Sequence, residues 1–264
     1  MNTMHAIRAE WTKLRTVTST PWLLFAAVAI TVGISATVTA TASNRLCPTP
    51  STCLDDLPKL SLTGAQYGQT LIVVLAVLVM SEEYTTGTIG VSLAAIPRRW
   101  QLYLSKAAIV TAMVIIVGSL GALGSLLVAR RVLPGTAVSA ANGDQRLSLA
   151  DEPTLRAVYG TVLYLALVAL LSYGVAAVLR DTAGSIATIL LLLYVAPILT
   201  SFITDPQWLN RIERLSPMLA GLKIQATTAL DTLPIGPWQG LGVLALWAAG
   251  ALLAGLLSLQ LRDA

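Results

Sequence analysis

The chain has 264 residues, of which 55% are hydrophobic and only 11% are charged, against roughly a quarter charged in ordinary soluble domains. The formal net charge is +4, but the basic residues stand mostly singly or in pairs beside apolar segments, which favours contact with lipid headgroups over nucleic acid. This composition excludes an ordinary soluble domain and gives no support to a nucleic-acid partner.

Six segments, each close to the ~20 residues that a helix needs to span a bilayer, contain no charged side chain: 21–42, 60–81, 107–129, 157–179, 182–204 and 238–261. A charge at the bilayer centre costs about 3 kcal/mol or more. Hydrocarbon also requires each segment to satisfy its own backbone polar groups. The sequence therefore predicts an all-α integral membrane protein, in which one domain over 1–264 has six transmembrane helices.

Residues 1–20 predict an amphipathic helix in the headgroup layer. Ile7, Trp11 and Leu14 follow the spacing of one helix face, while Lys13 and Arg15 lie on other faces among the lipid phosphates. One interpretation is an anchor for the first span. The other is an elbow helix that also contacts a cytoplasmic partner.

Both cysteines of the chain, Cys47 and Cys53, fall in the polar loop between the first two spans. The five residues between them include two prolines, and this spacing can close a small disulfide ring, which persists only in an oxidising compartment. Two unpaired thiols are the alternative.

The sequence of the connector 82–99, between the second and third spans, predicts a short helix parallel to the membrane rather than a flexible loop. Negative charge is unfavourable at the C-terminal end of a helix, where the helix dipole is also negative. The acidic pair at the end of the second span is therefore better explained by an interaction with the N-terminus of the next helix or with a basic side chain of a partner. A Gly-Thr pair then opens the helix, an apolar face follows, and a proline stops it before two arginines. The residues concerned are Glu82, Glu83, Gly87, Thr88, Ile89, Leu93, Pro97, Arg98 and Arg99.

Two further features lie within and after the third span. Gly118, Gly121 and Gly124 form a strip that permits close helix approach, for packing inside the molecule or, as the less favoured alternative, for a dimer seam. Residues 205–237 are semi-polar and predict two short helices at the outer interface before the last span.

Basic residues lead into the first span and favour a cytoplasmic N-terminus. An even number of spans then places both termini in the cytoplasm of a cell-membrane protein. On this topology the cytoplasmic basic residues are Arg8, Lys13, Arg15, Arg98, Arg99, Lys106, Arg180 and Arg262.

Catalytic patterns are missing from the sequence. It contains no G-x-x-x-x-G-K-[ST] phosphate loop, and its single histidine, His5, permits neither a histidine-based triad nor H-E-x-x-H zinc chemistry. The predicted spans carry no internal charge of the kind that ion-coupled carriers use. We therefore expect a chain that is not an enzyme, holds no metal or cofactor, and receives energy from another protein.

The run Glu83-Tyr84-Thr85-Thr86-Gly87-Thr88-Ile89, with Leu93-Ala94 and Pro97-Arg98-Arg99 after it, resembles the cytoplasmic signature of type-2 ATP-binding-cassette (ABC) exporter permeases. The run Ala9-Glu10-Trp11-Thr12-Lys13-Leu14-Arg15, followed by Ser19-Thr20-Pro21-Trp22, is similar to actinobacterial members of that group.

The resemblance implies that the connector 82–99 is a coupling helix docked on a cytoplasmic ATPase subunit, which binds the ATP. It also implies that two permease chains, identical or different, pair in the membrane and move substrate outward. Gly90 stands where many relatives carry a basic residue, so one contact to the ATPase is expected to be missing. The alternative is a non-transporting anchor or sensor that docks a cytoplasmic partner through the same helix.

Overall fold

The computed structural model describes residues 19–45, 56–85, 99–132, 147 and 149–261. All regular structure in these ranges is helical. Six of the described helices are long and apolar enough to cross a membrane, which agrees with the six predicted spans. They are α2 (Ser19–Arg45), α4 (Ala65–Thr85), α6 (Arg99–Val132), α8 (Glu152–Leu179), α9 (Thr182–Thr200) and α12 (Pro237–Leu261).

The second span begins later than the charge-free segment 60–81. A separate short helix, α3 (Leu57–Ser61), comes first, with Asp56 as its N-cap, and residues 62–64 form a turn. The reason is local, because the Asp56 side chain accepts a hydrogen bond from the backbone N–H of Lys59 and starts a helix of its own. The membrane-crossing helix α4 then begins at Ala65.

The third and fifth spans also differ from their charge-free segments 107–129 and 182–204. Helix α6 begins at Arg99 and therefore includes Lys106, which is buried. At its other end Arg130 and Arg131 occupy the last turn, where positive charge favours the helix dipole. At this C-terminal end of α6 the two arginines are tolerated because long charged side chains at a helix end can reach the polar interface. Helix α9 ends at Thr200, before the last residues of its segment.

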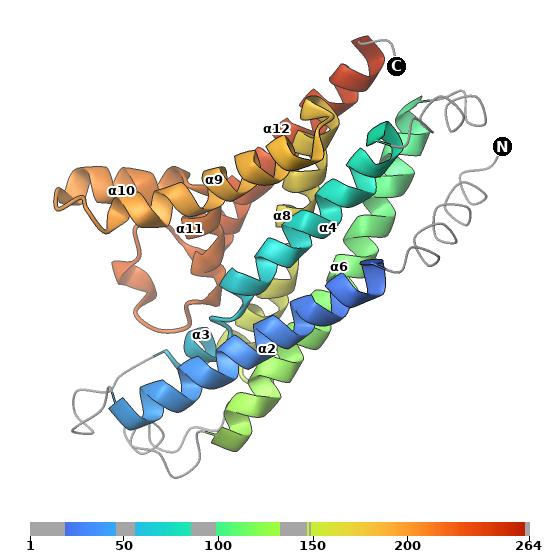
Figure 1. Cartoon of the computed structure of the whole chain (residues 1–264). Coiled ribbons are helices and arrows are strands. Elements are labelled where there is room, and N and C mark those ends of the chain that lie inside the picture. The colour runs from blue at the N-terminus through green and yellow to red at the C-terminus, as the bar shows by residue number, and fades with distance from the viewer. Residues whose placement is uncertain (1–18, 46–55, 86–98, 133–146, 148, 262–264) are drawn as a thin grey trace.

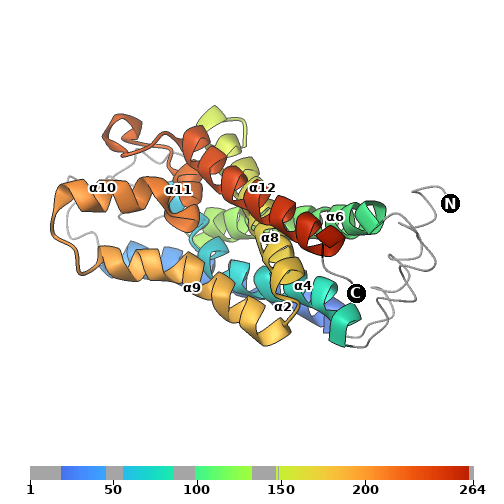
Figure 2. The same cartoon turned by 90° about the horizontal axis from the view of Figure 1, so that it is seen from above.

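Helix α8 is the central helix of the bundle (Figures 1 and 2). It packs against α4, α6, α9 and α12, and 67% of an apolar 18-residue stretch of α8 is buried, against 17% of the corresponding stretch of α9. Helix α9 is thus the span held least by the rest of the chain. Between α9 and α12 lie α10 (Pro206–Leu215), α11 (Pro217–Leu222) and the 3-10 turns η2 (Lys223–Gln225) and η3 (Leu230–Thr232). The two predicted short helices of 205–237 are therefore present as α10 and α11.

The glycine strip of α6 packs inside the molecule. A Cβ at Gly118 would lie 3.3 Å from a Leu165 methyl group of α8, and one at Gly121 would lie 3.3 Å from the Thr31 methyl group of α2. Gly124 faces α2 as well. This agrees with the intramolecular interpretation of the strip.

Figure 1 shows the C-terminal ends of α4, α8 and α12 and the N-terminal ends of α6 and α9 at the same end of the bundle. We name it the Arg180 end, after the residue between α8 and α9. The opposite end holds α3 and the N-terminus of α8, and we name it the Asp56 end. The α9–α10 pair extends to the left in Figure 1, away from α6.

Candidate functional site

The connector 82–99 begins and ends on described helices at the Arg180 end. Glu82 and Glu83 lie in the last turn of α4, with Glu82 half-buried, and Arg99 is the first residue of α6. The other predicted coupling residues lie outside the described ranges, so their placement stays a prediction: Gly87, Thr88, Ile89, Leu93, Pro97 and Arg98.

Two further predicted groups also lie outside the described ranges. They are the elbow residues Ile7, Trp11, Lys13, Leu14 and Arg15, and the cysteines Cys47 and Cys53. The elbow helix and the disulfide therefore remain predictions.

At the Arg180 end, polar contacts join α4, α8, α9 and α12. The Thr182 hydroxyl at the start of α9 donates a 2.8 Å hydrogen bond to Ser81 Oγ near the end of α4. Arg180 ends α8 in the left-handed conformation with φ 55° and donates a 3.1 Å hydrogen bond to the Ser258 carbonyl of α12. Because these contacts flank the start of the connector, a displacement of α4 at this end would act directly on α9.

A second set of contacts links α6, α8 and α12 close to the same end. The Tyr173 hydroxyl donates a 2.9 Å hydrogen bond to the Tyr103 carbonyl, and the Tyr103 hydroxyl donates a 3.1 Å hydrogen bond to the Leu252 carbonyl. Gly255 permits this approach, because a Cβ there would lie 2.6 Å from the Tyr103 hydroxyl oxygen. The first turns of α6 are therefore fixed to the core of the bundle.

The interior holds a polar cluster that joins four helices. We name it the Gln69 cluster, after its central residue, and it comprises Gln66, Gln69 and Thr70 of α4, Tyr164 of α8, Tyr194 of α9 and Met218 of α11. Gln69 and Tyr164 have no exposed side-chain surface. The cluster is the main polar feature of the described membrane interior.

Each hydrogen-bonding group in the Gln69 cluster has a partner. Tyr194 donates its hydroxyl proton to the Gln66 carbonyl at 2.7 Å, so Thr70, 2.9 Å away, must donate to Tyr194. The Gln69 amide donates to the Tyr194 hydroxyl at 3.2 Å and to the Met218 sulfur at 3.4 Å, and its oxygen accepts from Tyr164.

All of these groups are neutral, so the cluster can join helices within hydrocarbon without burying a charge. It provides the only described side-chain hydrogen bonds that attach the middle of α9 to its neighbours: they involve Tyr194. Since α9 is otherwise the least buried span, the position of α9 depends strongly on this cluster.

Sequence reasoning missed the Gln69 cluster. The signal was Gln69, whose side-chain amide lies inside an apolar segment, whereas Gln66 takes part only through its backbone carbonyl. Amides at membrane depth require partners. The sequence alone did not indicate that Tyr164 and Tyr194 supply them.

The Asp56 end is closed by a second polar cluster. The Asp56 carboxylate accepts hydrogen bonds from the Thr227 N–H and hydroxyl and from the Thr228 N–H at 3.1 Å. Arg156 of α8 donates to the Ala226 carbonyl at 2.7 Å. These contacts attach the segment after η2 to α3 and α8, and make this end a compact cap.

Comparison with known families adds one finding. A family model described as ABC-2 family transporter protein matches residues 6–197. The match extends from the segment before α2 into α9 and includes the whole connector 82–99. No curated protein matches the chain.

Proposed function

This chain belongs to the ABC-2 family of transporter proteins, and we propose that it is the transmembrane permease subunit of an ATP-driven exporter. A separate cytoplasmic ATPase subunit hydrolyses ATP and docks on the connector 82–99. The observation that carries the proposal is the family match over residues 6–197, which contains that connector.

The Arg180 end supports a mechanical role for the connector. It begins on α4 and ends on α6, and both helices are tied to the bundle there, α4 through Ser81 and α6 through Tyr103. A displacement of the connector would therefore be transmitted to α9 through the Ser81 contact and to α12 through the Tyr103 contact. We place the ATPase on this end, in the cytoplasm, with the Asp56 end outside.

Alternating access requires some spans to move relative to others, and α9 is the candidate for the moving span. It is the least buried of the described spans and is anchored by Thr182 at one end and Tyr194 in the middle. Helix α8, the most buried of the described spans, serves as the fixed core. The substrate is moved outward past neutral, apolar surfaces.

We propose that the working unit contains two permease chains and two ATPase subunits. The exposed apolar face of α9, with Leu191 at 66% and Ile198 at 57% exposure, supplies surface for lipid or for a second permease chain. The Glu82, Glu83, Arg98 and Arg99 side chains supply charged contacts to the ATPase.

Co-purification tests the proposal. The tagged full chain is extracted in mild detergent from its native cells, and the partners that elute with it are identified. We expect an ATPase with a phosphate loop whose ATP hydrolysis changes when this chain is removed. A partner without nucleotide chemistry would instead support the anchor or sensor function.

A further inference from the structure

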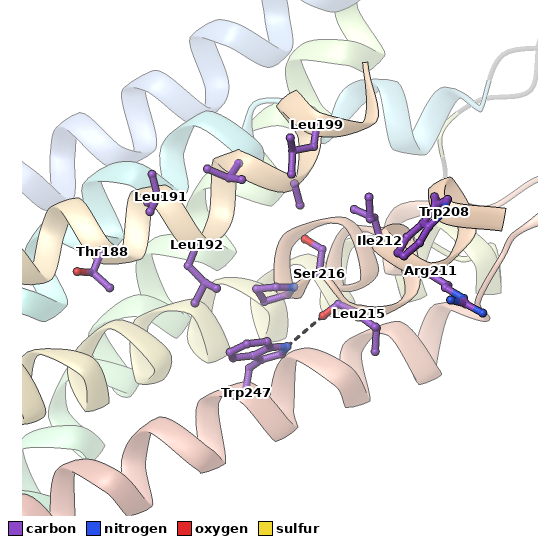
Figure 3. A pocket seen from close by; sticks show the side chains of 13 residues that line it. Thr188, Leu191, Leu192, Leu199, Trp208, Arg211, Ile212, Leu215, Ser216 and Trp247 are labelled. Carbon is purple, nitrogen blue, oxygen red and sulfur yellow. Dashed lines mark hydrogen bonds between the residues drawn. The ribbon is translucent and has the colours of Figure 1, made fainter. Parts of the chain in front are cut away.

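A groove of ≈ 730 Å³ lies between α9, α10, the start of α11 and α12 (Figure 3). We name it the α9–α10 groove. Its walls are mostly apolar and include Leu192 and Leu199 from α9, Ile212 from α10 and Trp247 from α12. The Trp247 indole donates a 3.1 Å hydrogen bond to the Leu215 carbonyl, which fixes α12 against the end of α10. The groove is therefore a formed feature of the fold.

One buried polar group in the groove has no partner. Ser216 is 7% exposed and lines the groove, and its hydroxyl oxygen makes no hydrogen bond. It precedes α11 as the N-cap residue but makes no side-chain cap bond. In Figure 3 its oxygen projects from the α10–α11 junction toward the side chains of α9. An unsatisfied buried hydroxyl costs free energy, so this position favours a ligand with a hydrogen-bond acceptor.

The side chain of Arg211 provides a positive charge at one end of the groove. Arg211 is exposed and lines the groove, with its guanidinium 5.5 Å from the centre of the Trp208 ring. The nearby carboxylate of Glu213 is already paired with Lys223 at 2.6 Å. Among the described residues no carboxylate pairs with Arg211, and its charge is available to an anion. Figure 3 shows Trp208 and Arg211 at one end and Thr188 at the other.

The length of the groove matches one leaflet of a bilayer. Its α9 wall extends from Thr188 to Leu199, which at about 1.5 Å per residue is roughly 16 Å. Half of the hydrocarbon core of a bilayer is about 15 Å thick. A single acyl chain can therefore lie along the groove with its polar head at the Arg211 end.

We propose that the α9–α10 groove binds one phospholipid: an acyl chain lies along the apolar walls, Arg211 contacts the phosphate and the Ser216 hydroxyl donates to an ester carbonyl. The groove supplies the three features that such a lipid requires: a cation at one end, a hydrogen-bond donor nearer its middle and apolar walls along its length. The site would hold α10 against α9 and α12. It requires only that the chain lies in a bilayer, and is independent of ATP-driven transport.

The test counts phospholipids that stay bound after purification. Full-length chain is reconstituted in vesicles of phosphatidylglycerol and phosphatidylethanolamine, extracted in mild detergent and weighed by native mass spectrometry. We expect one retained phospholipid per chain. Arg211→Gln should weaken retention about tenfold, and Ser216→Ala about fivefold, as expected for loss of a charge-assisted and a neutral hydrogen bond. Val195→Trp, which fills the groove, should abolish it.

The matched control is Arg214→Gln, because Arg214 is exposed on the same helix but does not line the groove. It should retain lipid like the wild type. Ser216→Ala should also leave the melting temperature in lipid-depleted detergent unchanged or higher, since it removes an unsatisfied buried hydroxyl. This measurement distinguishes a loss of lipid binding from a loss of folding. Equal retention by the Arg211 and Arg214 variants would overturn the proposal. A second result would also overturn the proposal: a Leu191→Cys variant that retains no lipid and forms a disulfide with a second copy of the chain.

Discussion

The hydroxyl of Tyr194 in α9 donates a 2.7 Å hydrogen bond to the carbonyl oxygen of Gln66 in α4, 128 residues earlier in the chain. The same oxygen accepts from Thr70 and from the Gln69 amide. Three contacts thus converge on one hydroxyl of the least buried span. Both the stability of the bundle and the freedom of α9 depend on this atom.

Replacing Tyr194 with Phe removes this hydroxyl and keeps the ring. We expect the free energy of unfolding in mixed micelles to fall by about 1–2 kcal/mol, because three hydrogen bonds are lost and each contributes about 0.6 kcal/mol in a membrane protein. Tyr67→Phe is the control, since Tyr67 is exposed on α4 and should change stability little. Equal losses for the two variants would show that the Gln69 cluster does not hold α9.

The pair Gln69 and Tyr164 permits a double-mutant cycle. Gln69→Leu leaves the fully buried Tyr164 hydroxyl without its acceptor, and we expect a loss of about 2–3 kcal/mol in the free energy of unfolding. Adding Tyr164→Phe should recover about 1 kcal/mol or more, because removing both partners of a hydrogen bond costs less than removing one. Strictly additive losses would contradict the coupling.

Gly64 sets the closest approach of α2 to the turn before α4. A Cβ there would lie 1.9 Å from the Thr31 carbonyl oxygen and 2.6 Å from Ser35 Oγ. The backbone of α2 cannot move aside as easily as a flexible side chain, so a methyl group at this position would force the two segments apart. Gly64→Ala should therefore lower the free energy of unfolding by about 2–3 kcal/mol. Gly33→Ala in α2, where nothing lies within 4 Å, should be neutral or slightly stabilising. A Gly64→Ala variant with an unchanged free energy of unfolding would show that α2 can shift without cost.

The double substitution Glu83→Ala with Gly87→Pro tests the proposed coupling. We expect the chain to remain folded in the membrane while ATP hydrolysis by the partner no longer drives transport, because the stiff connector is altered where it receives the ATPase. Transport and ATP hydrolysis are measured together in proteoliposomes. Asp231→Ala, an exposed acidic position outside the connector, is the control. Wild-type transport by the double variant would count heavily against the coupling role.

The cysteines test both the disulfide and the topology. If Cys47 and Cys53 are bonded outside the cell, a membrane-impermeant maleimide should label intact cells only after reduction. Cys47→Ser should leave one thiol that is labelled without reduction. Labelling of this variant only after the membrane is permeabilised would place the loop inside and reverse the proposed orientation.

The sequence indicated the long helices because the cost of burying charge or bare backbone in hydrocarbon is a property of each segment alone. Charge-free runs therefore predicted the six spans, and the semi-polar segment 205–237 predicted the two short helices that the structure shows as α10 and α11. The ends were less accurate, since Asp56 starts a separate helix α3 and α6 extends past Lys106.

The amino-acid sequence by itself determined that this protein lies in a membrane and where most of its spans fall. Only the tertiary structure decided that Gln69 meets Tyr164 and Tyr194, that the glycine strip of α6 faces its own helices, and that Ser216 and Arg211 share one groove. The physical reason is that transfer into lipid acts residue by residue, whereas these contacts depend on pairs of side chains from distant helices, whose meeting is fixed only when the helices pack.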